Sequence, residues 1–457
     1  MRTGKATLLL VAIGLFMGLS ATAETKTNTL IWHKKPDTID ADISSWNVRQ
    51  LLEHVAASTG WKVYLDPGAV HAVSVKFKET PSGEALQKML GNLNFILVPE
   101  KNSPWRLYVF RTRREQATQL VAPPRKITKP IPNELVVRMK PGSKTKIEDL
   151  ARSLNAKIIG RMDAQGAYLL QFADEAATQL ASQQLANNAD VAGTENNYPM
   201  EPPPALAAGN GNPPNLQLNP QATGNNKQLI VGLIDTPVQT LPGTLNSFML
   251  PEQHVAGDFN VLADQLTHGT AMAETILQSI GKVTGGSSYV QILPVDVYGN
   301  NESTTTFDVA NGIVQAVNSG ADILNLSLGG TGDSQILADT IASVIAKGIP
   351  VYAAAGNEPV ATPTYPAAYP GVNAVTAIDP ATGQLAPYAN RGSFVDIYAP
   401  GDSYVFYGGQ TWMVEGTSPA TAFTTGRAIG LADLNHASAS DAPTLLQTYS
   451  PHTSIPK

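Results

Sequence analysis

The chain has 457 residues, of which 43% are hydrophobic, 15% are charged and none is cysteine. This length predicts roughly two to four domains, each large enough to have its own core. The lack of cysteine excludes a disulfide scaffold, a thiolate metal site, a cysteine nucleophile and a lipid-anchoring cysteine.

The formal net charge of −6 is unevenly distributed along the chain. Residues 201–457 contain 6 basic and 19 acidic side chains, a net charge of −13, whereas residues 24–116 carry +3 and residues 117–200 carry +2. An acidic part with so few cations is unsuited to phosphate contacts, which excludes nucleic acid as its partner. It is suited to attract the basic N-terminal part of its own chain.

The first residues have the pattern of an export signal. Two basic residues precede the apolar run 8–19, and Ala21 and Ala23 supply the small side chains that a signal peptidase recognises. An uncleaved membrane anchor is the alternative, but the apolar run is shorter than the ~20 residues of a spanning helix. We therefore expect an exported protein, periplasmic or extracellular, with no membrane span once the signal peptide 1–23 is removed.

Apolar side chains in residues 24–116 follow helical spacing in some stretches and strand alternation in others. The pattern predicts a small α+β domain with helices at 46–55 and 82–90, single strands at 61–65 and 73–77, and a hairpin of strands 95–98 and 107–110 around 102–104.

A second small α+β unit is predicted at residues 127–200, after the Pro-rich and basic segment 122–126. Its expected strands are 134–139, 158–161 and 168–172, and its expected helices are 147–154 and 175–185. The next stretch, 201–225, is rich in Gly, Asn, Pro and Gln and has no periodicity, which predicts an extended and accessible linker.

From residue 226 onward, short apolar runs alternate with helical patterns. The expected strands are 229–234, 290–295, 323–328 and 350–354, and the expected helices are 270–280, 307–317 and 335–346. Continuous apolar strands between helices are typical of a doubly wound parallel sheet that is covered on both faces. We therefore predict an α/β domain at 226–457, preceded by the two small α+β domains.

Four polar residues lie at the ends of elements of this predicted sheet, where such folds place their functional sites. Asp235 ends a strand, His268 opens a helix, Asn357 follows a strand, and Ser418 lies where a strand meets a helix. Alone, each has a structural interpretation as a cap, a turn or a core residue. Together they supply the hydroxyl nucleophile, the imidazole base, the orienting carboxylate and the oxyanion donor that acyl transfer requires.

The order Asp, His, Asn, Ser, together with the sequences that flank these residues, resembles the subtilisin-like serine proteases, or subtilases. The resemblance covers about residues 226–457 and extends to the segments 292–297, 365–370 and 388–401. It implies a subtilisin-like fold and a secreted serine endopeptidase that acts on polypeptides and needs no cofactor for its chemistry.

The resemblance also implies a role for each site residue. Ser418 would be the nucleophile, His268 the general base and then acid, and Asp235 the group that fixes the imidazole tautomer. Asn357 and the Ser418 backbone N–H would stabilise the oxyanion. The segment that pairs with the substrate backbone would be Ser327, Leu328 and Gly329.

Two further implications concern the rest of the chain. Residues 127–200 resemble a subtilase inhibitory prodomain, which implies a precursor that cleaves itself between Tyr198 and Asn226. Subtilases are often stabilised by Ca²⁺, but the sequence contains no acidic loop with convincing ligand spacing, and we assign no metal-binding residue.

Residues 24–116 resemble the short N-terminal domain of secretins and TonB-dependent receptors. The resemblance implies an interaction module that binds another protein of the cell envelope. A spacer, or a part of the pro-region, is the alternative interpretation.

Two positions depart from the subtilase pattern. Pro237 stands where the family usually has glycine, and the family's proline four residues after the nucleophile is Ala422 here, with Pro419 nearby. Because proline fixes φ and lacks an N–H, Pro237 predicts a changed geometry at the strand end. An inactive subtilase-fold protein that binds peptides or acts as a scaffold is the alternative function, whereas the chain order and the lack of a Gly-x-Ser-x-Gly elbow disfavour an α/β-hydrolase esterase.

Overall fold

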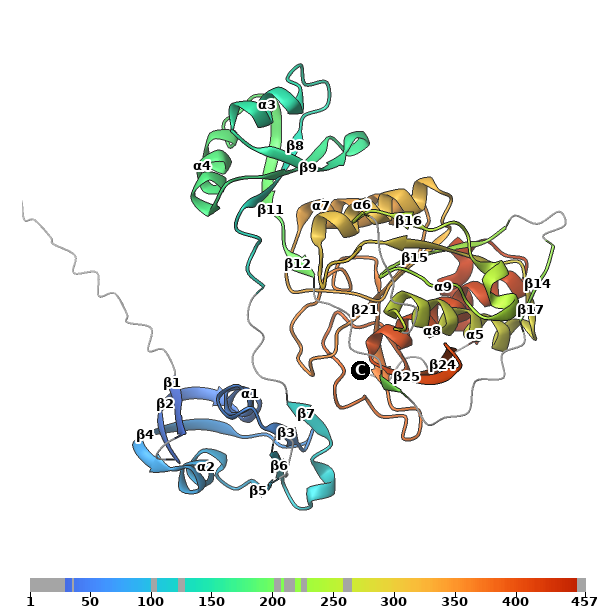
Figure 1. The fold of residues 1–457 in the computed structure, drawn as a ribbon. Helices are drawn as coiled ribbons and strands as arrows, with labels where there is room; N and C mark the ends of the chain where they lie inside the picture. The colour runs from blue at the N-terminus through green and yellow to red at the C-terminus, as the bar shows by residue number, and fades with distance from the viewer. Residues whose placement is uncertain are drawn as a thin grey trace, which may run out of the picture. The chain divides into compact units, whose positions relative to one another are not determined.

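A computed structural model describes most of the chain, in eight segments (Figure 1). These segments are 29–34, 37–99, 105–121, 128–200, 207–208, 218–222, 228–257 and 265–449. The predicted signal peptide, the hairpin turn at 102–104, the segment 122–126 and most of the linker lie outside the described residues.

The N-terminal residues contribute to two sheets. In the first compact unit, an antiparallel sheet has the order β1-β2-β4 and is accompanied by α2. The bounds are β1 Thr29–Lys34, β2 Asp37–Asn47, β4 Ala72–Pro81 and α2 Ser82–Leu90. The strand β4 and the helix α2 confirm the sequence pattern. Strands β1 and β2 were not predicted, although Ile39, Ala41 and Ile43 of β2 alternate with polar residues and are buried.

The second compact unit begins with another sheet, of order β5-β6-β3-β7. Its strands are β5 Asn94–Val98, β6 Arg106–Phe110, β3 Lys62–Leu65 and β7 Gln119–Val121, and helix α1, Val48–Thr59, precedes β3. The pairing of β5 with β6 is antiparallel, as expected for the predicted hairpin. The short strand β7 was not predicted.

Residues 128–200 form an antiparallel sheet of order β11-β8-β10-β9 with two helices. The elements are β8 Glu134–Met139, α3 Ile147–Ser153, β9 Lys157–Met162, β10 Ala167–Gln171, α4 Glu175–Leu185 and β11 Val191–Asn196. All but β11 match the predicted elements. Side chains from the sheet and both helices form a small core of their own.

The C-terminal part has a seven-stranded, all-parallel sheet of order β16-β18-β15-β20-β21-β22-β23. Its strands are β15 Ile230–Asp235, β16 Gln253–His254, β18 Gln291–Asp296, β20 Ile323–Leu326, β21 Val351–Ala354, β22 Asn373–Ile378 and β23 Ile397–Pro400. The order reverses after β15, so the predicted doubly wound topology is confirmed.

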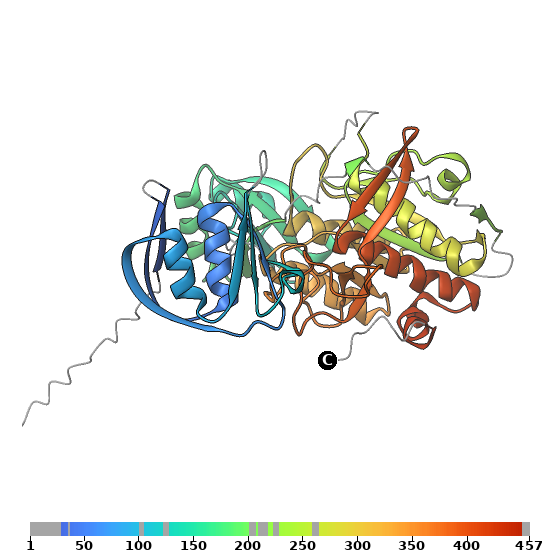
Figure 2. The ribbon, with the colours of Figure 1, turned by 90° about the horizontal axis from the view of Figure 1, so that it is seen from below.

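Helices cover both faces of this sheet (Figures 1 and 2). They are α5 His268–Thr284, α6 Thr306–Asn318, α7 Gln335–Ala346, α8 Thr417–Leu434 and α9 Ala442–Tyr449. Successive strand residues alternate between two cores: Ile323 and Tyr352 face the core of α5 and α8, whereas Leu324 and Val351 face the core of α6 and α7. This two-sided burial explains the nearly continuous apolar strands of the sequence.

None of the helices among the described residues is long and apolar enough to cross a membrane. A hairpin of β24, Asp402–Tyr407, and β25, Gln410–Glu415, lies between the last sheet strand and α8. This hairpin was not predicted.

Helices α5 and α8 approach each other most closely at Gly426. A Cβ atom on Gly426 would lie 2.4 Å from the carbonyl oxygen of Ile276, whereas one on Gly430, a turn later, would have its nearest neighbour at 3.3 Å. The crossing therefore requires a glycine at the first of these positions.

We predict that Gly426→Ala lowers the free energy of unfolding by roughly 1–3 kcal/mol, because the two helices must separate. The matched control Gly430→Ala should change it by less than about 1 kcal/mol, since helix propensity favours alanine. Urea unfolding of the full chain carrying Ser418→Ala, which prevents self-cleavage, measures both. Equal effects of the two substitutions would contradict the close crossing.

Candidate active site

The catalytic candidates meet at the carboxyl ends of the parallel strands. Asp235 is the last residue of β15, and its Oδ1 lies 2.8 Å from Nδ1 of His268, the first residue of α5. Both side chains are buried, with relative exposures of 1% and 4%. Since a carboxylate only accepts hydrogen bonds, Nδ1 must carry the proton and Nε2 must present its lone pair.

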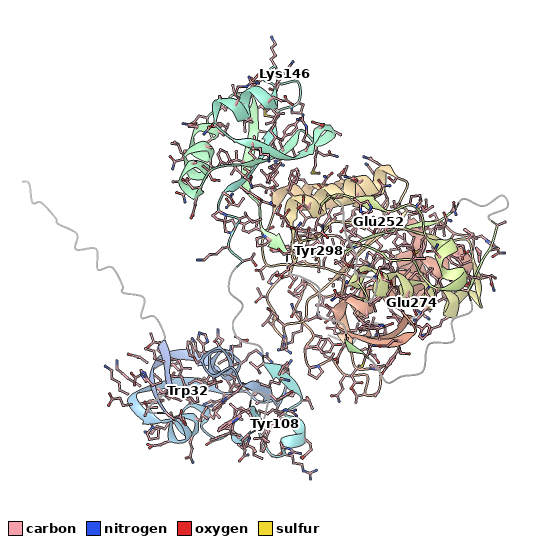
Figure 3. The ribbon with its side chains drawn as sticks, viewed as in Figure 1. Trp32, Tyr108, Lys146, Glu252, Glu274 and Tyr298 are labelled. Atoms are coloured by element: carbon pink, nitrogen blue, oxygen red, sulfur yellow. The ribbon has the colours of Figure 1, made fainter. Side chains whose placement is uncertain are left out.

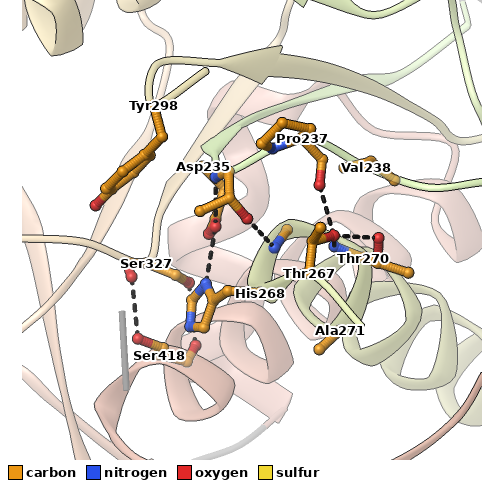
Figure 4. A network of polar contacts seen from close by, with 12 residues as sticks. Asp235, Pro237, Val238, Thr267, His268, Thr270, Ala271, Tyr298, Ser327 and Ser418 are labelled. Atoms are coloured by element: carbon orange, nitrogen blue, oxygen red, sulfur yellow. Dashed lines mark hydrogen bonds and ion pairs between the residues drawn. The ribbon is translucent and has the colours of Figure 1, made fainter. Parts of the chain in front are cut away.

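The Asp235–His268 pair is held by a network between the segment after β15 and the start of α5 (Figure 4). The Thr236 hydroxyl accepts a hydrogen bond from Gly269 N at 2.8 Å, and Thr267 Oγ1 donates to the Pro237 carbonyl at 2.6 Å. Thr267 is also the N-cap of α5. The two threonines thereby fix the position of the helix start relative to the strand end.

The expected distortion at Pro237 is not found. Proline supplies the carbonyl that Thr267 needs, and the strand end keeps its pairing, with Val297 N donating to Asp235 O at 3.1 Å. The absent N–H of Pro237 therefore does not prevent the carboxylate from reaching His268.

Ser418 is the second residue of α8, after the N-cap Gly416. Pro419 is thus the third helical residue, within the first turn, where its missing N–H costs no intrahelical bond. Ser418 is 3% exposed, and its Oγ donates to the carbonyl of Ser327 at 3.0 Å.

The imidazole of His268 lies between Asp235 and Ser418 (Figure 4). Its Nε2 is buried and has no hydrogen-bond partner among the described residues. A rotation of the Ser418 side chain away from the Ser327 carbonyl is therefore needed before the imidazole can accept its proton. Such loose geometry is common in sites without substrate.

Asn357 is oriented by the residue that precedes Ser418. Its Oδ1 accepts hydrogen bonds from Thr417 N at 2.7 Å and Thr417 Oγ1 at 3.1 Å. With Oδ1 engaged in this way, the Nδ2 amide is the group that is directed to donate. The Ser418 N–H lies in the first turn of α8, where N–H groups have no intrahelical acceptor.

The predicted substrate-pairing residues Ser327, Leu328 and Gly329 follow β20, which ends at Leu326 rather than 328. The bridge between Gly330 and Tyr365 holds this segment, with hydrogen bonds of 2.8 and 2.7 Å. The structure therefore brings Asp235, His268, Ser418, Asn357 and the segment 327–329 into one region. Sequence reasoning missed the orienting threonines at 236, 267 and 417, although each one directly adjoins a site residue.

Calcium remains a prediction without ligands. In the parts of the chain that the structure describes, no group of three or more His, Asp or Glu side chains is placed to hold a metal ion.

The domain at 128–200 contacts the helices next to the site. The Glu195 carboxylate accepts hydrogen bonds from Gln335 N at 2.6 Å and Ile336 N at 2.8 Å, in the first turn of α7. Asn197 Oδ1 accepts one from Phe307 N at 3.1 Å, in the first turn of α6. These contacts place acceptors at two positive helix ends.

The chain then continues along the acidic domain as an added strand. Strand β12, Pro199–Met200, pairs antiparallel with β19, Thr304–Thr305, and Met200 is 1% exposed. The short strand β13, Ala207–Ala208, pairs with β25, which leads to Ser418. The prodomain is thus followed by two short strands that pair with elements of the acidic domain.

Comparison with known proteins decides the family. The subtilase family model matches residues 226–451, and subtilisin from Bacillus pumilus is 34% identical over 215 residues, which are 45% of this chain and 76% of the relative. The chain belongs to the subtilase family. Subtilisin E of Bacillus subtilis is 34% identical over 45% of this chain, which spans only about half of that relative, 55% of its length.

The prodomain is matched separately. The model of the fervidolysin N-terminal prodomain covers residues 116–197, a range that begins earlier than the predicted 127–200. The structure of fervidolysin from Fervidobacterium pennivorans, described as a keratinolytic enzyme related to subtilisin, gives a TM-score of 0.52 at 19% identity, over 67% of this chain and 55% of that one. The epidermin leader peptide processing serine protease of Staphylococcus aureus gives 0.52 at 16% identity, over 69% of this chain and 92% of that one. These likenesses show a shared fold.

We predict that Gly269→Ala disrupts the Asp235–His268 pair, because a Cβ on Gly269 would lie 2.0 Å from the Thr236 carbonyl oxygen. The helix start must move by an ångström or more, and the low-field proton resonance of His268 Nδ1–H should disappear from the ¹H NMR spectrum. Asp235→Asn, which removes the carboxylate but leaves the backbone intact, serves as the reference for that loss. An unchanged resonance in Gly269→Ala would show that the Asp235–His268 hydrogen bond does not depend on the close contact between the strand end and the helix start.

Proposed function

We propose that this subtilase is a serine endopeptidase that hydrolyses polypeptides through an acyl-enzyme on Ser418. The observation that carries the proposal is the buried 2.8 Å pair of Asp235 and His268, whose free Nε2 faces Ser418. Asn357, oriented by Thr417, supplies the complementary oxyanion donor.

The reaction follows from these positions. Ser418 Oγ leaves the Ser327 carbonyl, transfers its proton to His268 Nε2 and bonds to the substrate carbonyl carbon. Asp235 stabilises the imidazolium, while Asn357 Nδ2 and the Ser418 N–H donate to the oxyanion. His268 then gives the proton to the leaving amine, the C–N bond breaks, and water attacks the ester by the reverse path. Loss of one oxyanion donor typically slows such reactions by ~10²–10³.

We infer that the chain is made as an inhibited precursor. The prodomain of net charge +2 meets a domain of −13, and Glu195, Asn197 and β12 bind beside the site. The proposed cleavage lies between Tyr198 and Asn226, and the retained prodomain is the rival outcome.

Export and the N-terminal module complete the proposal. The pattern of residues 1–23 supports secretion to the periplasm or the medium. The small α+β module at 24–116, with a net charge of +3, supports an interaction role, for which an envelope protein is the proposed partner.

An inactive peptide-binding protein is the second candidate. The observation that favours it is the Ser418 hydroxyl, which is bonded to the Ser327 carbonyl instead of His268. A fluorophosphonate probe separates the candidates, because only an activated serine reacts with it.

We predict that the purified precursor shortens itself by a cut between Tyr198 and Asn226 and that Ser418→Ala stays at full length. Intact-mass analysis of both proteins, together with fluorophosphonate labelling of the parent, measures this. Identical cleavage of the Ser418→Ala protein would refute self-processing. A folded parent that neither shortens nor labels would favour the inactive peptide-binding protein.

A second prediction concerns prodomain release. Burial raises the pKa of Asp308 in α6 to about 6, the hydrogen bond from Thr305 lowers it, and the nearby Glu134 of the prodomain raises it further. Because Glu134 of the docked prodomain raises this pKa, docking favours the protonated carboxyl, so binding should be tighter below about pH 6 than above it.

The processed prodomain should therefore remain bound at about pH 5 and dissociate more at about pH 7.5, as size-exclusion chromatography can measure. Asp308→Asn should flatten this dependence. The control Thr331→Ala removes the hydrogen bond between the Thr331 and Thr128 hydroxyls at the same interface, which involves no titratable group, and should weaken binding equally at both pH values. An unchanged pH dependence in Asp308→Asn would contradict the role of this carboxyl.

A further inference from the structure

Helix α5 covers the open edge of the β24–β25 hairpin. Strand β24 pairs with β25 on one side only, so the backbone groups on its other side need partners. Side chains of α5 supply these partners, an acceptor for a backbone N–H and a donor for a backbone carbonyl.

The partners are a carboxylate and an amide. Phe406 N donates to both Oε atoms of Glu274, at 2.9 and 3.1 Å. Gln278 Nε2 donates to the Tyr404 carbonyl at 2.7 Å and to Glu274 Oε1 at 3.2 Å. We call these four residues the α5–hairpin latch.

The latch is buried in the interior of the domain. Glu274 is 2% exposed and Gln278 is 8% exposed, and Figure 3 labels Glu274. A buried carboxylate without a paired cation is costly, so such a group is rarely placed in a core without a role.

Both ends of the latch lead to reacting groups. Helix α5 begins with His268, and Glu274 lies under two turns further along it. Strand β25 ends at Glu415, directly before Gly416, whose N–H donates to the Gly401 carbonyl at 2.8 Å at the base of the hairpin. Ser418 follows two residues later. A shift of the hairpin against α5 therefore changes the distance between base and nucleophile.

We propose that Glu274 is a positioning residue for the reaction: it holds the His268 helix against the hairpin that leads to Ser418, and loss of its proton loosens this hold. The proposal rests on the proposed function, since it assigns Glu274 to the reaction of Ser418.

The electrostatics support the direction of the effect. Burial raises the pKa of Glu274 to about 7, while the Phe406 N–H and the Gln278 amide lower it. A carboxyl with a raised pKa favours the closed, buried state when protonated. Above the ordinary carboxyl pKa this stability begins to be lost, and above about pH 7 the ionised group favours opening to water.

Charged groups on the packed elements do not offset this charge. Lys282 of α5 and Asp402 and Tyr404 of β24 line a neighbouring cavity of about 540 Å³, and none of them contributes to the pKa shift of Glu274. On α8, which packs against α5, the titratable groups are Arg427 and Asp433, and Asp433 accepts a hydrogen bond from Ser288.

The first test uses the intact chain carrying Ser418→Ala, so it does not depend on activity. Trp412 of β25 reports on the hairpin by its fluorescence, because its Nε1 donates to Tyr407 O at 3.2 Å across the hairpin end. A titration from about pH 5.5 to about pH 8.5 should show a transition near 7. This transition should vanish with Glu274→Gln, which stays neutral, and with Trp412→Phe, which removes the reporter.

The second test uses the active, processed enzyme and a fluorophosphonate probe, with the maximal labelling rate and the probe affinity measured separately. At about pH 6, Glu274→Ala should lower the maximal rate about tenfold with affinity within about twofold, whereas Glu274→Gln keeps the acceptor and should stay within about threefold of the parent rate. At about pH 8.5, the maximal labelling rate of Glu274→Gln relative to the parent should be higher than at about pH 6, because Glu274 ionises only in the parent.

The control Ser279→Ala removes a different buried hydrogen bond of α5, from Ser279 Oγ to Phe423 O at 2.7 Å, and should not change the pH dependence of labelling. Equal losses in Glu274→Ala and Glu274→Gln at every pH, or a Trp412 transition that persists in Glu274→Gln, would overturn the proposal. If Glu274→Ala does not fold, the Glu274→Gln comparisons still decide. If no variant labels but the Trp412 transition behaves as expected, the proposed function fails while the latch stands.

Discussion

The hydrogen bond between Asp235 and His268 is the contact on which the arrangement of the site depends. It joins the end of the central strand β15 to the start of α5, in surroundings from which water is nearly excluded. There a carboxylate acts strongly on the imidazole and fixes its tautomer, so that Nε2 faces Ser418. The bond depends on the hydrogen bonds of the Thr236 and Thr267 hydroxyls, which fix the distance between the end of the strand and the start of the helix.

Helix α5 is the element that ties the remaining parts together. Its first residue is His268, its middle packs against α8 at Gly426, and its polar side chains complete the edge of β24. Ser418 lies at the start of α8 and follows the hairpin, so both contacts of α5 affect the distance between His268 and Ser418. Close packing transmits such shifts because a core without voids deforms as a unit.

The prodomain contacts the same domain at the N-terminal ends of two of its helices. Glu195 and Asn197 accept hydrogen bonds at the first turns of α7 and α6, where N–H groups lack intrahelical partners. Burial raises the pKa of Glu195, as it does that of Asp308, against the lowering effect of the helix N–H groups on Glu195. Docking therefore combines helix-end electrostatics with the burial of carboxyls whose pKa values are raised.

The sequence by itself determined the fold class, the order of the domains and the identity of the four polar candidates. Periodicity sufficed for α4 and α7, whose bounds match the prediction, because their apolar stripes are regular and their ends carry caps such as Asp174 and Ser334. Motifs sufficed for Asp235 and Ser418, since strand-end positions in a parallel sheet converge in space.

Only the tertiary structure decided the rest. Strand β11 pairs with β8 and strand β2 pairs with β4, partners that are distant in sequence and that local patterns do not record. The Pro237 carbonyl is paired with the Thr267 hydroxyl 30 residues away, and the Glu274 carboxylate is paired with Phe406 N, 132 residues away. A polar residue on a helix has the same local sequence whether it faces water or a strand edge, so only the fold distinguishes the two.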